Sequence, residues 1–568
     1  MAINNREASA SESFDVVVVG AGAGGMTAAA VAAAEGMKTL LLEKTEYVGG
    51  TTAISGGMVW APNCDFDAAG ADSAEQASAY LAETVPIEDG EESRQTFLKA
   101  APEAIAYLQR NTAVQLKPVP YYPDYYPDAR GATTNGRVLE PLPFDGRELG
   151  AAFDWLRPPL PEFTVFGGLM VARPDIPHFI NVFRSFKSAA RVARLVSAYA
   201  LQRTRYRRGT DLVLGNALAG RLLKSLLDRS VPIRLKAAVR RIVHDGRRVS
   251  GLVVVEDGVE KFVAARRGVI LATGGFSHDE ERREALLPRE AREFSAAAAG
   301  ATGDGLRLGG KVGGHIAQGG LGPAFWTPAS QYRKADGRLV VFPHTVTDRG
   351  KPGLIAVNAE ARRFTNEAVS YHEFVRAMLR ADNVGSAVPT HLICDRRFLW
   401  KYGFGAIKPM TVRLRPYKDG GYLTEARSIR ELARALDLNE DALMATVERY
   451  NRDARDGIDT EFDRGGDPYQ RHLGDASVEP NPCLAPIEEP PFFSIEVYPA
   501  DLGTASGLNT SPDALVLDAS GKPIPRLYAC GNDMLSIMRG AYPGPGITLG
   551  PALTFGYLAA RHAAGGTT

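Results

Sequence analysis

Residues 16–19 are four consecutive valines, which glycines follow at once. β-Branched side chains that are apolar on both faces are typical of a strand buried inside a parallel sheet. Residues 25–35 are rich in alanine, as in a closely packed helix, and a second apolar stretch over 39–43 ends in an acid. This pattern predicts a strand–turn–helix–strand unit at the start of an α/β fold.

The turn of this unit has the glycine spacing of a dinucleotide-binding fingerprint. Gly20 suits a tight turn, Gly22 lets the backbone approach a diphosphate, and Gly25 lets the helix lie close to the strand. Glu43 stands where an acid binds a ribose hydroxyl, about twenty residues further on. The pattern predicts a dinucleotide site. The alternative is a nucleotide-free unit whose glycines serve close packing alone.

The segment 44–60 is rich in glycine and hydroxyl residues and cannot form a packed element. Backbone N–H groups of such a loop suit a phosphate and the polar edge of a flavin ring. The stretch therefore favours FAD over NAD. No histidine lies between Lys44 and Trp60, so we expect the FAD to be bound without a covalent link.

Two later apolar strands end in loops of the same kind. The strand over 268–272 leads into a Thr-Gly-Gly loop, and the strand over 527–530 leads into Gly-Asn. We therefore expect a Rossmann-like FAD-binding domain of the two-dinucleotide type, with an inserted α+β catalytic domain. Because 568 residues exceed one hydrophobic core, several domains are expected. The predicted FAD-binding domain comprises 1–150, 212–322 and 491–568, the catalytic domain 323–490, and a basic insertion 151–211.

The insertion contains no acid between residues 176 and 210. Its basic residues Arg184, Lys187, Arg191 and Arg194 recur at helical spacing, and apolar residues between 182 and 200 recur on the opposite side. The pattern predicts one amphipathic helix. Such a helix suits an anionic membrane surface, and the alternative is a solvated helix packed on its own protein.

Composition narrows the classes of function. The formal net charge is zero, so no overall field attracts nucleic acid. Four widely spaced cysteines form no CxxC pair, which argues against a metal cluster or a disulfide framework and fits a reducing cytoplasm. The polar N-terminus does not read as a signal peptide, and no apolar run reaches membrane-spanning length. We expect a cytoplasmic protein with peripheral membrane contact through 176–208.

Three further motifs contain tyrosines. They are Pro123-Asp124-Tyr125-Tyr126, Asn366-Glu367 with Tyr371 four residues after the acid, and Tyr542-Pro-Gly-Pro-Gly546. Together with the FAD motifs, the chain resembles the 3-ketosteroid Δ1-dehydrogenases, FAD flavoproteins of the fumarate reductase-like superfamily. The resemblance covers nearly the whole chain, and the long 151–210 segment is similar to membrane-associated members that accept sterones with long side chains.

The resemblance implies roles for these residues in 1,2-desaturation of a 3-ketosteroid. Tyr371 resembles the base, Tyr125 its supporting phenol, and Tyr542 with the Gly546 amide the pair that holds the 3-keto oxygen. FAD accepts the hydride, and a quinone or another acceptor reoxidises it. The implied FAD-binding residues are Gly20, Gly22, Ala23, Gly24, Gly25, Glu43, Lys44, Gly49, Gly50, Thr51, Thr52, Ser55, Gly56, Gly57, Val239, Ala272, Thr273, Gly274, Gly275, Asp304, Gly531, Asn532, Thr548 and Leu549.

Physical chemistry supports this assignment. Donors on the ketone stabilise developing enolate charge, and a tyrosine acts as a base when a neighbour stabilises its phenolate. Other functions stay open from the sequence. These are 4,5-desaturation of 5α-steroids, a fumarate reductase-like reaction on dicarboxylates, and a membrane-tethered electron carrier without enzyme activity. The dicarboxylate reaction would need an arginine proton donor and cationic clamps, where this chain has tyrosines.

Overall fold

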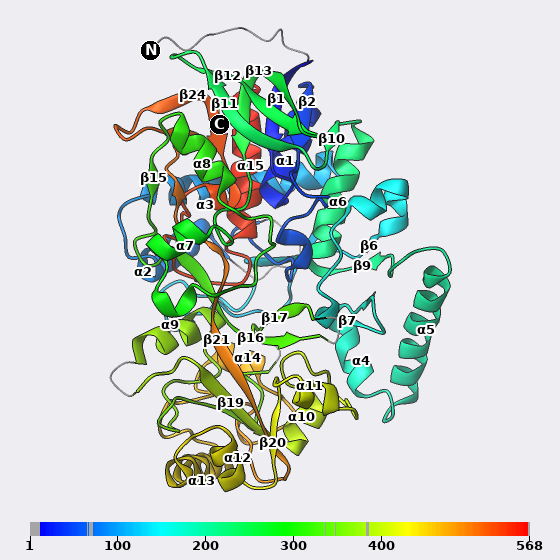
Figure 1. Cartoon of the computed structure of the whole chain (residues 1–568), viewed down its shortest axis with the longest axis vertical. Helices are drawn as coiled ribbons and strands as arrows, with labels where there is room; N and C mark the ends of the chain where they lie inside the picture. Colours follow the sequence, from blue (N-terminus) through cyan, green and yellow to red (C-terminus); the bar gives the residue numbers. More distant parts are fainter. Residues whose placement is uncertain are drawn as a thin grey trace.

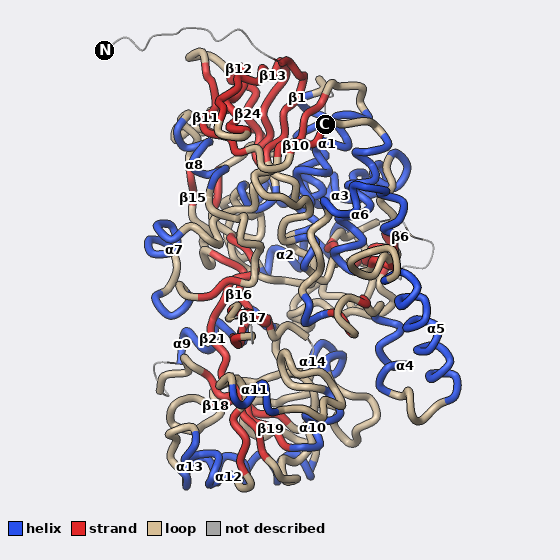
Figure 2. Tube along the Cα trace, turned by 45° about the vertical axis from the view of Figure 1, so that its right-hand side comes forward, coloured by secondary structure: helices blue, strands red, loops and turns tan. Residues whose placement is uncertain are grey.

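The computed structural model describes residues 12–64, 66, 72–334, 337–346, 348–381 and 385–565. These residues form two regions placed end to end along the long axis of the molecule (Figure 1). Each region is built on its own sheet, and Figure 2 shows the two groups of strands at opposite ends. A separate helical arm extends from one side of the molecule in both views.

The first sheet contains the strands expected from the valine and leucine runs. β1 pairs in parallel with β2 and with the end of β13, and β13 also pairs in parallel with β24. The order is β10 (Ile233–Arg234), β2 (Thr39–Leu42), β1 (Glu12–Val19), β13 (Val259–Leu271), β12 (Val249–Glu256) and β11 (Ala238–His244). β24 (Pro523–Ala529) also pairs with β13, and β23 (Leu515–Leu517) pairs with β24. The predicted FAD-type α/β fold is confirmed.

Helices pack around this sheet through small residues. A Cβ on Gly556 of α15 would lie 2.6 Å from the Gly24 carbonyl oxygen of α1, so the two helices approach closely because both positions are glycine. The surrounding helices are α1 (Ala23–Ala34), α2 (Ala74–Thr84), α3 (Glu91–Asn111), α6 (Leu214–Asp228), α8 (Asp304–Lys311) and α15 (Leu549–Ala563).

The second region has a mostly antiparallel sheet covered by short helices. Its strands are β17 (Leu339–Pro343), β16 (Ala324–Arg333), β21 (Phe492–Thr504), β19 (Thr390–Asp395), β18 (Leu354–Val357), β14 (Phe294–Ser295) and β20 (Thr424–Ala426). Its helices are α7 (Glu280–Leu286), α9 (Tyr371–Arg380), α10 (Arg396–Tyr402), α11 (Arg415–Asp419), α12 (Ile429–Ala435), α13 (Glu440–Asp456) and α14 (Pro468–Leu473). Long β21 leads back toward the first region, where the Phe276 N–H donates to Thr504 Oγ1 at 3.4 Å.

Short strands of two to four residues form small sheets apart from the two large ones. They are β3 (Val59–Trp60), β4 (Leu116–Pro118), β5 (Val138–Pro141), β6 (Phe144–Asp145), β7 (Thr164–Val165), β8 (Leu169–Met170), β9 (Asp211–Leu212), β15 (Ile316–Ala317) and β22 (Gly507–Leu508). The proposed domain boundaries stay predictions.

The arm differs from the single amphipathic helix expected from the sequence. α4 (Ile176–Ile180) ends at Asn181, and α5 (Phe186–Arg203) begins after Ser185, whose Oγ accepts a hydrogen bond from the Ser188 N–H. This N-cap starts a new helix and breaks the expected periodicity. Arg184 therefore lies in the turn. Arg191 does not belong to a free basic face, because its Nε donates to Asp175 at 2.7 Å.

Candidate functional site

The glycine turn after β1 has the geometry that a dinucleotide requires. Gly20 has a φ of +104°, and a Cβ there would lie 2.2 Å from the Ala272 carbonyl oxygen. A Cβ on Gly25 would lie 1.9 Å from the Gly20 carbonyl oxygen, so only glycine allows α1 to pack this closely. A Cβ on Gly22 meets no protein atom within 4 Å. Its Cα therefore faces open space at the N-terminus of α1, where an anion is favoured.

One pocket extends from this turn to the tyrosines of the three further motifs. The sequence-predicted residues that line it are Gly20, Gly22, Ala23, Gly24, Glu43, Gly50, Thr51, Thr52, Ser55, Gly56, Gly57, Tyr125, Ala272, Thr273, Gly274, Tyr371, Gly531, Asn532, Tyr542, Gly546, Thr548 and Leu549. Those that the structure places behind or beside the lining are Gly25, Lys44, Gly49, Val239, Gly275 and Asp304. The pocket therefore joins a nucleotide-type site to a cluster of phenols.

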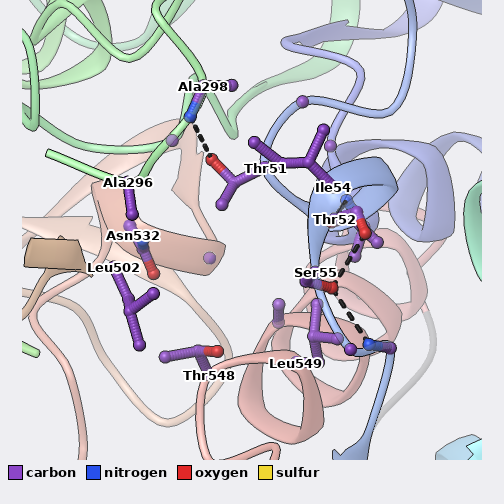
Figure 3. A pocket seen from close by; sticks show the side chains of 18 of the residues that line it. Thr51, Thr52, Ile54, Ser55, Ala296, Ala298, Leu502, Asn532, Thr548 and Leu549 are labelled. Atoms are coloured by element: carbon purple, nitrogen blue, oxygen red, sulfur yellow. Dashed lines mark hydrogen bonds between the residues drawn. The ribbon is translucent and has the colours of Figure 1, made fainter. Parts of the chain in front are cut away.

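The loop 51–57 forms one wall of the pocket through its hydroxyl groups (Figure 3). Thr51 Oγ1 accepts a hydrogen bond from the Ala298 N–H at 3.0 Å, which ties this loop to the opposite wall. Thr52 Oγ1 accepts from the Ala23 N–H at 3.1 Å. Ser55 Oγ donates to the Thr52 carbonyl oxygen at 2.8 Å and accepts from the Gly57 N–H at 3.1 Å.

The acid at the end of β2 is oriented by two backbone donors. Glu43 Oε2 accepts from the Ala21 N–H at 3.0 Å, and Oε1 accepts from the Thr45 N–H at 2.9 Å. Each carboxylate oxygen keeps a lone pair for a ribose hydroxyl. Lys44 instead forms an ion pair with Asp304 at 2.6 Å. This pair connects β2 to α8, outside the pocket lining.

Tyr125, Tyr371 and Tyr542 form one buried aromatic cluster at the other end of the pocket. The Tyr125 hydroxyl donates to the Tyr371 hydroxyl at 3.1 Å. The ring of Tyr542 stacks on Tyr125 with centroids 5.7 Å apart and meets Tyr371 edge-on at 5.1 Å. Tyr126 points elsewhere, because its hydroxyl donates to Glu373 Oε1 at 2.7 Å. Tyr125 is therefore the neighbour that supports Tyr371.

Burial dominates the electrostatics of the phenols. It raises the pKa of Tyr371 well above the usual phenol value, and the nearby Tyr542 adds to this, whereas the hydrogen bond from Tyr125 lowers it. Burial also raises the pKa of Tyr125, and it raises the pKa of Tyr542 to about 12. Tyr542 is thus a hydrogen-bond donor at neutral pH, and Tyr371 needs help from its surroundings to ionise.

The loop that carries Tyr125 is fixed from two sides. The Pro543 carbonyl oxygen accepts from the Tyr125 N–H at 3.0 Å and from the Tyr80 hydroxyl at 2.6 Å. Asp124 is buried, and its Oδ2 accepts from Arg137 at 2.7 Å. The loop is therefore tied directly to the turn after Tyr542, which explains how residues far apart in sequence form one cluster.

Tyr371 is the first residue of α9, whose start is set by a cap and a buried ion-pair network. Ser370 Oγ accepts from the Glu373 N–H at 3.2 Å. Just before it, Glu367 accepts from Arg363 and Arg464 at 2.8 and 3.0 Å, and all three side chains are fully buried. The segment 363–367 therefore fixes the start of α9, and with it Tyr371, through buried ion pairs.

The Gly546 backbone presents an N–H group near Tyr542. Gly546 has a φ of +89°, and a Cβ there would lie 2.5 Å from the Met58 carbonyl oxygen, so the turn requires glycine. Its carbonyl oxygen accepts from the Trp60 N–H at 3.1 Å. Within the described residues, the Gly546 N–H donates to no protein acceptor, and it remains available to a ligand.

Sequence reasoning missed several lining residues, which come from the predicted FAD-binding segments, the insertion and the second region. They are Met58, Tyr122, Arg157, Leu160, Phe163, Ala296, Ala298, Gly300, Pro343, Thr345, Val346 and Leu502, among others. Met58 lies in the segment 44–60, and Tyr122 lies three residues before Tyr125, so both could have been found from those motifs. The others belong to segments without a motif, and tertiary folding alone brings them to the pocket.

Comparison with known proteins agrees with this geometry. A family model described as "FAD binding domain" matches residues 15–549. The chain is 36% identical to 3-oxosteroid 1-dehydrogenase of Mycobacterium tuberculosis, over 97% of this chain and 98% of that protein. It belongs to the 3-ketosteroid dehydrogenase family of FAD-binding oxidoreductases. It is likewise 36% identical to 4-oxocyclohex-2-ene-1-carboxylate 5-dehydrogenase of Sinomonas cyclohexanicum, over 97% of this chain and 93% of that protein.

A solved member of this family has the same fold over its whole length. The 3-ketosteroid Δ1-dehydrogenase of Sterolibacterium denitrificans, in complex with 1,4-androstadiene-3,17-dione, superimposes with a TM-score of 0.91 at 36% identity. The match covers 98% of this chain and 100% of that one. The predicted family, fold and FAD cofactor are confirmed. The open space at Gly22 fits the diphosphate of FAD, and the remaining acceptor capacity of the Glu43 carboxylate fits its ribose. No helix in the described ranges has the length and apolar character needed to cross a membrane.

Proposed function

We propose that this enzyme introduces a double bond between the α and β carbons of a 3-ketosteroid. The observation that carries the proposal is the cluster of three buried tyrosines in the same pocket that Gly546 and the nucleotide-binding turn line. Tyr542 and the Gly546 N–H donate to the ketone oxygen and stabilise enolate charge, which acidifies the α carbon. The Tyr371 phenolate, stabilised by Tyr125, removes the α proton. Bound FAD supplies the acceptor for the hydride from the β carbon.

A neutral ketone suits this pocket better than a keto acid such as the substrate named for the Sinomonas relative. Arg157 is the one Lys or Arg side chain that lines the pocket in the described residues, and it lies against Thr45 and Tyr47 at the nucleotide end. A buried carboxylate near the tyrosines would therefore lack a cation, which is costly. The apolar lining residues, including Met58, Leu160, Phe163 and Val346, suit a steroid skeleton.

Substrate competition tests this proposal. With one artificial electron acceptor, kcat/KM is measured for androst-4-ene-3,17-dione and for 4-oxocyclohexanecarboxylate. The proposal predicts at least a hundredfold preference for the steroid and a 1,4-diene-3-one as its product. A preference for the keto acid would contradict it. A 5α-reduced steroid distinguishes the alternative regiochemistry, because 1,2-desaturation leaves the 4,5-bond saturated.

We also propose that the FAD is held without a covalent bond. In the described part of the chain, neither histidine nor cysteine lines the pocket, and these are common attachment points for flavins. Acid precipitation should release the flavin into the supernatant, and flavin in the washed pellet would contradict this.

For turnover to continue, the reduced flavin must pass its electrons to an acceptor. We propose a quinone, which should restore the oxidised flavin spectrum under anaerobic conditions.

The arm provides a surface for peripheral membrane contact. Phe183 and Phe186 are 89% and 91% exposed, and the cationic side chains of Arg184 and Lys187 lie beside them and are also exposed. We propose that the two rings enter the headgroup boundary of an anionic membrane while the cations bind lipid phosphates. The substrates proposed for such an enzyme partition into membranes, so this contact would bring enzyme and substrate together.

Liposome sedimentation tests the role of the arm. The double variant Phe183→Ser/Phe186→Ser should lose binding to anionic liposomes at low salt while retaining activity on a soluble steroid. Val412→Ser is the matched control, because Val412 is 83% exposed in the second region. Arg191 is left unchanged because it pairs with Asp175. Equal sedimentation of the double variant and the control would contradict the proposal.

A further inference from the structure

Arg157 enters the pocket from a segment that no nucleotide motif marks. Its N–H donates to the Val48 carbonyl oxygen at 2.9 Å, and its own carbonyl oxygen accepts from Asn216 Nδ2 at 2.8 Å. The next residue after Val48, Gly49, donates its N–H to the Ala21 carbonyl oxygen at 2.7 Å. These bonds hold the Arg157 backbone close to the glycine turn at the N-terminus of α1.

The Arg157 guanidinium has few partners within the protein. It lies over the Tyr47 ring at 5.6 Å, and Nη2 is 3.5 Å from Thr45 Oγ1. Its Nε is buried without a hydrogen-bond partner. No carboxylate of the described residues forms an ion pair with it. Two other arginines of the insertion are paired with carboxylates: Arg173 with Glu140, and Arg191 with Asp175. Arg157 is therefore a cation that lines the pocket and has no carboxylate partner among the described residues.

The charges around the pocket indicate what these donors bind. Bound FAD brings an anionic diphosphate into the groove, and burying such a charge without a cation is costly. Lys44 is committed to Asp304 and Thr302. The N-terminus of α1 supplies backbone N–H groups and a partial positive charge. A guanidinium can donate paired hydrogen bonds to phosphate oxygens. Arg157 can do so because it forms no ion pair with a carboxylate of the described residues.

We propose that Arg157 binds the diphosphate of FAD, so that the insertion as well as the Rossmann-like core holds the cofactor. The α1 N-terminus and the Arg157 guanidinium would both contact the anion. This inference concerns cofactor binding and is independent of the proposed steroid reaction. The competing role for Arg157 is to bind the carboxylate of a keto-acid substrate, and the experiment separates the two.

The test measures FAD release from holoenzyme by the rise of flavin fluorescence after dilution. Arg157→Gln, which removes the charge and keeps much of the size, should release FAD at least ten times faster than the unmodified protein. Arg157→Lys should release FAD at an intermediate rate, because it keeps the positive charge but loses the paired donors. Arg147→Gln is the control, because this exposed arginine, which precedes the insertion, lies outside the pocket. Affinity for riboflavin, which lacks the diphosphate, should be the same in all four proteins.

Three results would overturn the proposal. The first is FAD release from Arg157→Gln at the unmodified rate. The second is an equal loss of riboflavin affinity, which would indicate a general disturbance of the pocket. The third is normal FAD retention together with a selective loss of turnover on 4-oxocyclohexanecarboxylate, which would assign the guanidinium to the substrate. If Arg157→Gln does not fold, Arg157→Lys serves as the test. FAD release from Arg157→Lys at the unmodified rate would then contradict paired hydrogen bonds between Arg157 and the diphosphate.

Discussion

Three tyrosines with the same covalent chemistry have different surroundings at this site. Tyr371 accepts a hydrogen bond from Tyr125 and starts a helix, whereas Tyr542 lies four residues before Gly546, whose N–H has no acceptor among the described residues. A hydrogen bond donated by Tyr125 favours the phenolate form of Tyr371. The proposed division into base and ketone donor rests on this contact, because burial raises the pKa of both tyrosines.

Tyr371→Phe tests the base directly, because it removes the hydroxyl and retains the ring. We expect a loss in kcat of about 10²–10⁴, the usual contribution of a positioned base. Steroid binding should change little, as followed by perturbation of the flavin spectrum. A loss below tenfold would exclude Tyr371 as the base.

The pH dependence follows from the direction of the Tyr371 pKa shift. Burial raises this pKa above the usual phenol value of about 10, so fewer than about one in a thousand molecules are ionised at pH 7. If the phenolate is the reactive form, kcat/KM should rise about tenfold per pH unit between pH 7 and 9. A flat profile over this range would contradict a phenolate base.

Tyr542→Phe removes one of the two proposed ketone donors. Loss of one such donor typically reduces kcat by about 10²–10³. We expect both kcat and steroid affinity to fall, because the donor contacts the ketone in the ground state as well. Wild-type kinetics would show that the ketone is held elsewhere in the pocket.

At the scale of elements, two glycines of the turn after β1 have different functions. Gly22 faces open space, whereas Gly25 faces the Gly20 carbonyl oxygen at a distance that excludes a Cβ. Gly22→Val should therefore fold but lose FAD, since its side chain occupies the approach of the diphosphate. Gly25→Ala should instead lower thermal stability. Flavin absorbance and circular dichroism of the two variants distinguish these outcomes.

The loop before α9 depends on the Glu367 ion pairs. Arg363 and Arg464 hold the pKa of Glu367 below its usual value despite burial. Glu367→Gln leaves Arg464 without an acidic partner among its described contacts and should reduce the free energy of unfolding by about 3–5 kcal/mol at pH 7. A glutamate with a lowered folded-state pKa stabilises above its unfolded pKa and loses this contribution as pH falls. The difference in the free energy of unfolding between the unmodified protein and Glu367→Gln should therefore become smaller below about pH 4.5, as measured by denaturant titration.

At the scale of the whole molecule, local sequence signals predicted the FAD region best. The valine run, the glycines and Glu43 form one contiguous unit, and the structure places them as expected. The three tyrosine motifs were found through family resemblance, because their contacts span hundreds of residues. Arg157 and the lining residues from 343–346 could not be predicted, since only the packing of the two regions brings them to the pocket.

The arm shows why periodicity alone was misleading. Arg191 has the spacing of an exposed basic residue, yet it pairs with Asp175 from the preceding turn. Ser185 supplies a cap that starts α5 and places Arg184 outside the helix. Both features depend on residues that do not take part in the repeat: Asp175, which precedes it, and Ser185, which lies within it. The exposed Phe183 and Phe186 keep the proposal of membrane contact open to the sedimentation test.

The most direct measurement of the central claim is anaerobic titration of the oxidised holoenzyme with androst-4-ene-3,17-dione. The account predicts that flavin absorbance bleaches as the steroid is converted to a 1,4-diene-3-one, and that the Tyr371→Phe variant binds the steroid with little bleaching. An oxidised flavin spectrum that persists in the unmodified protein, with steroid bound, would contradict the account.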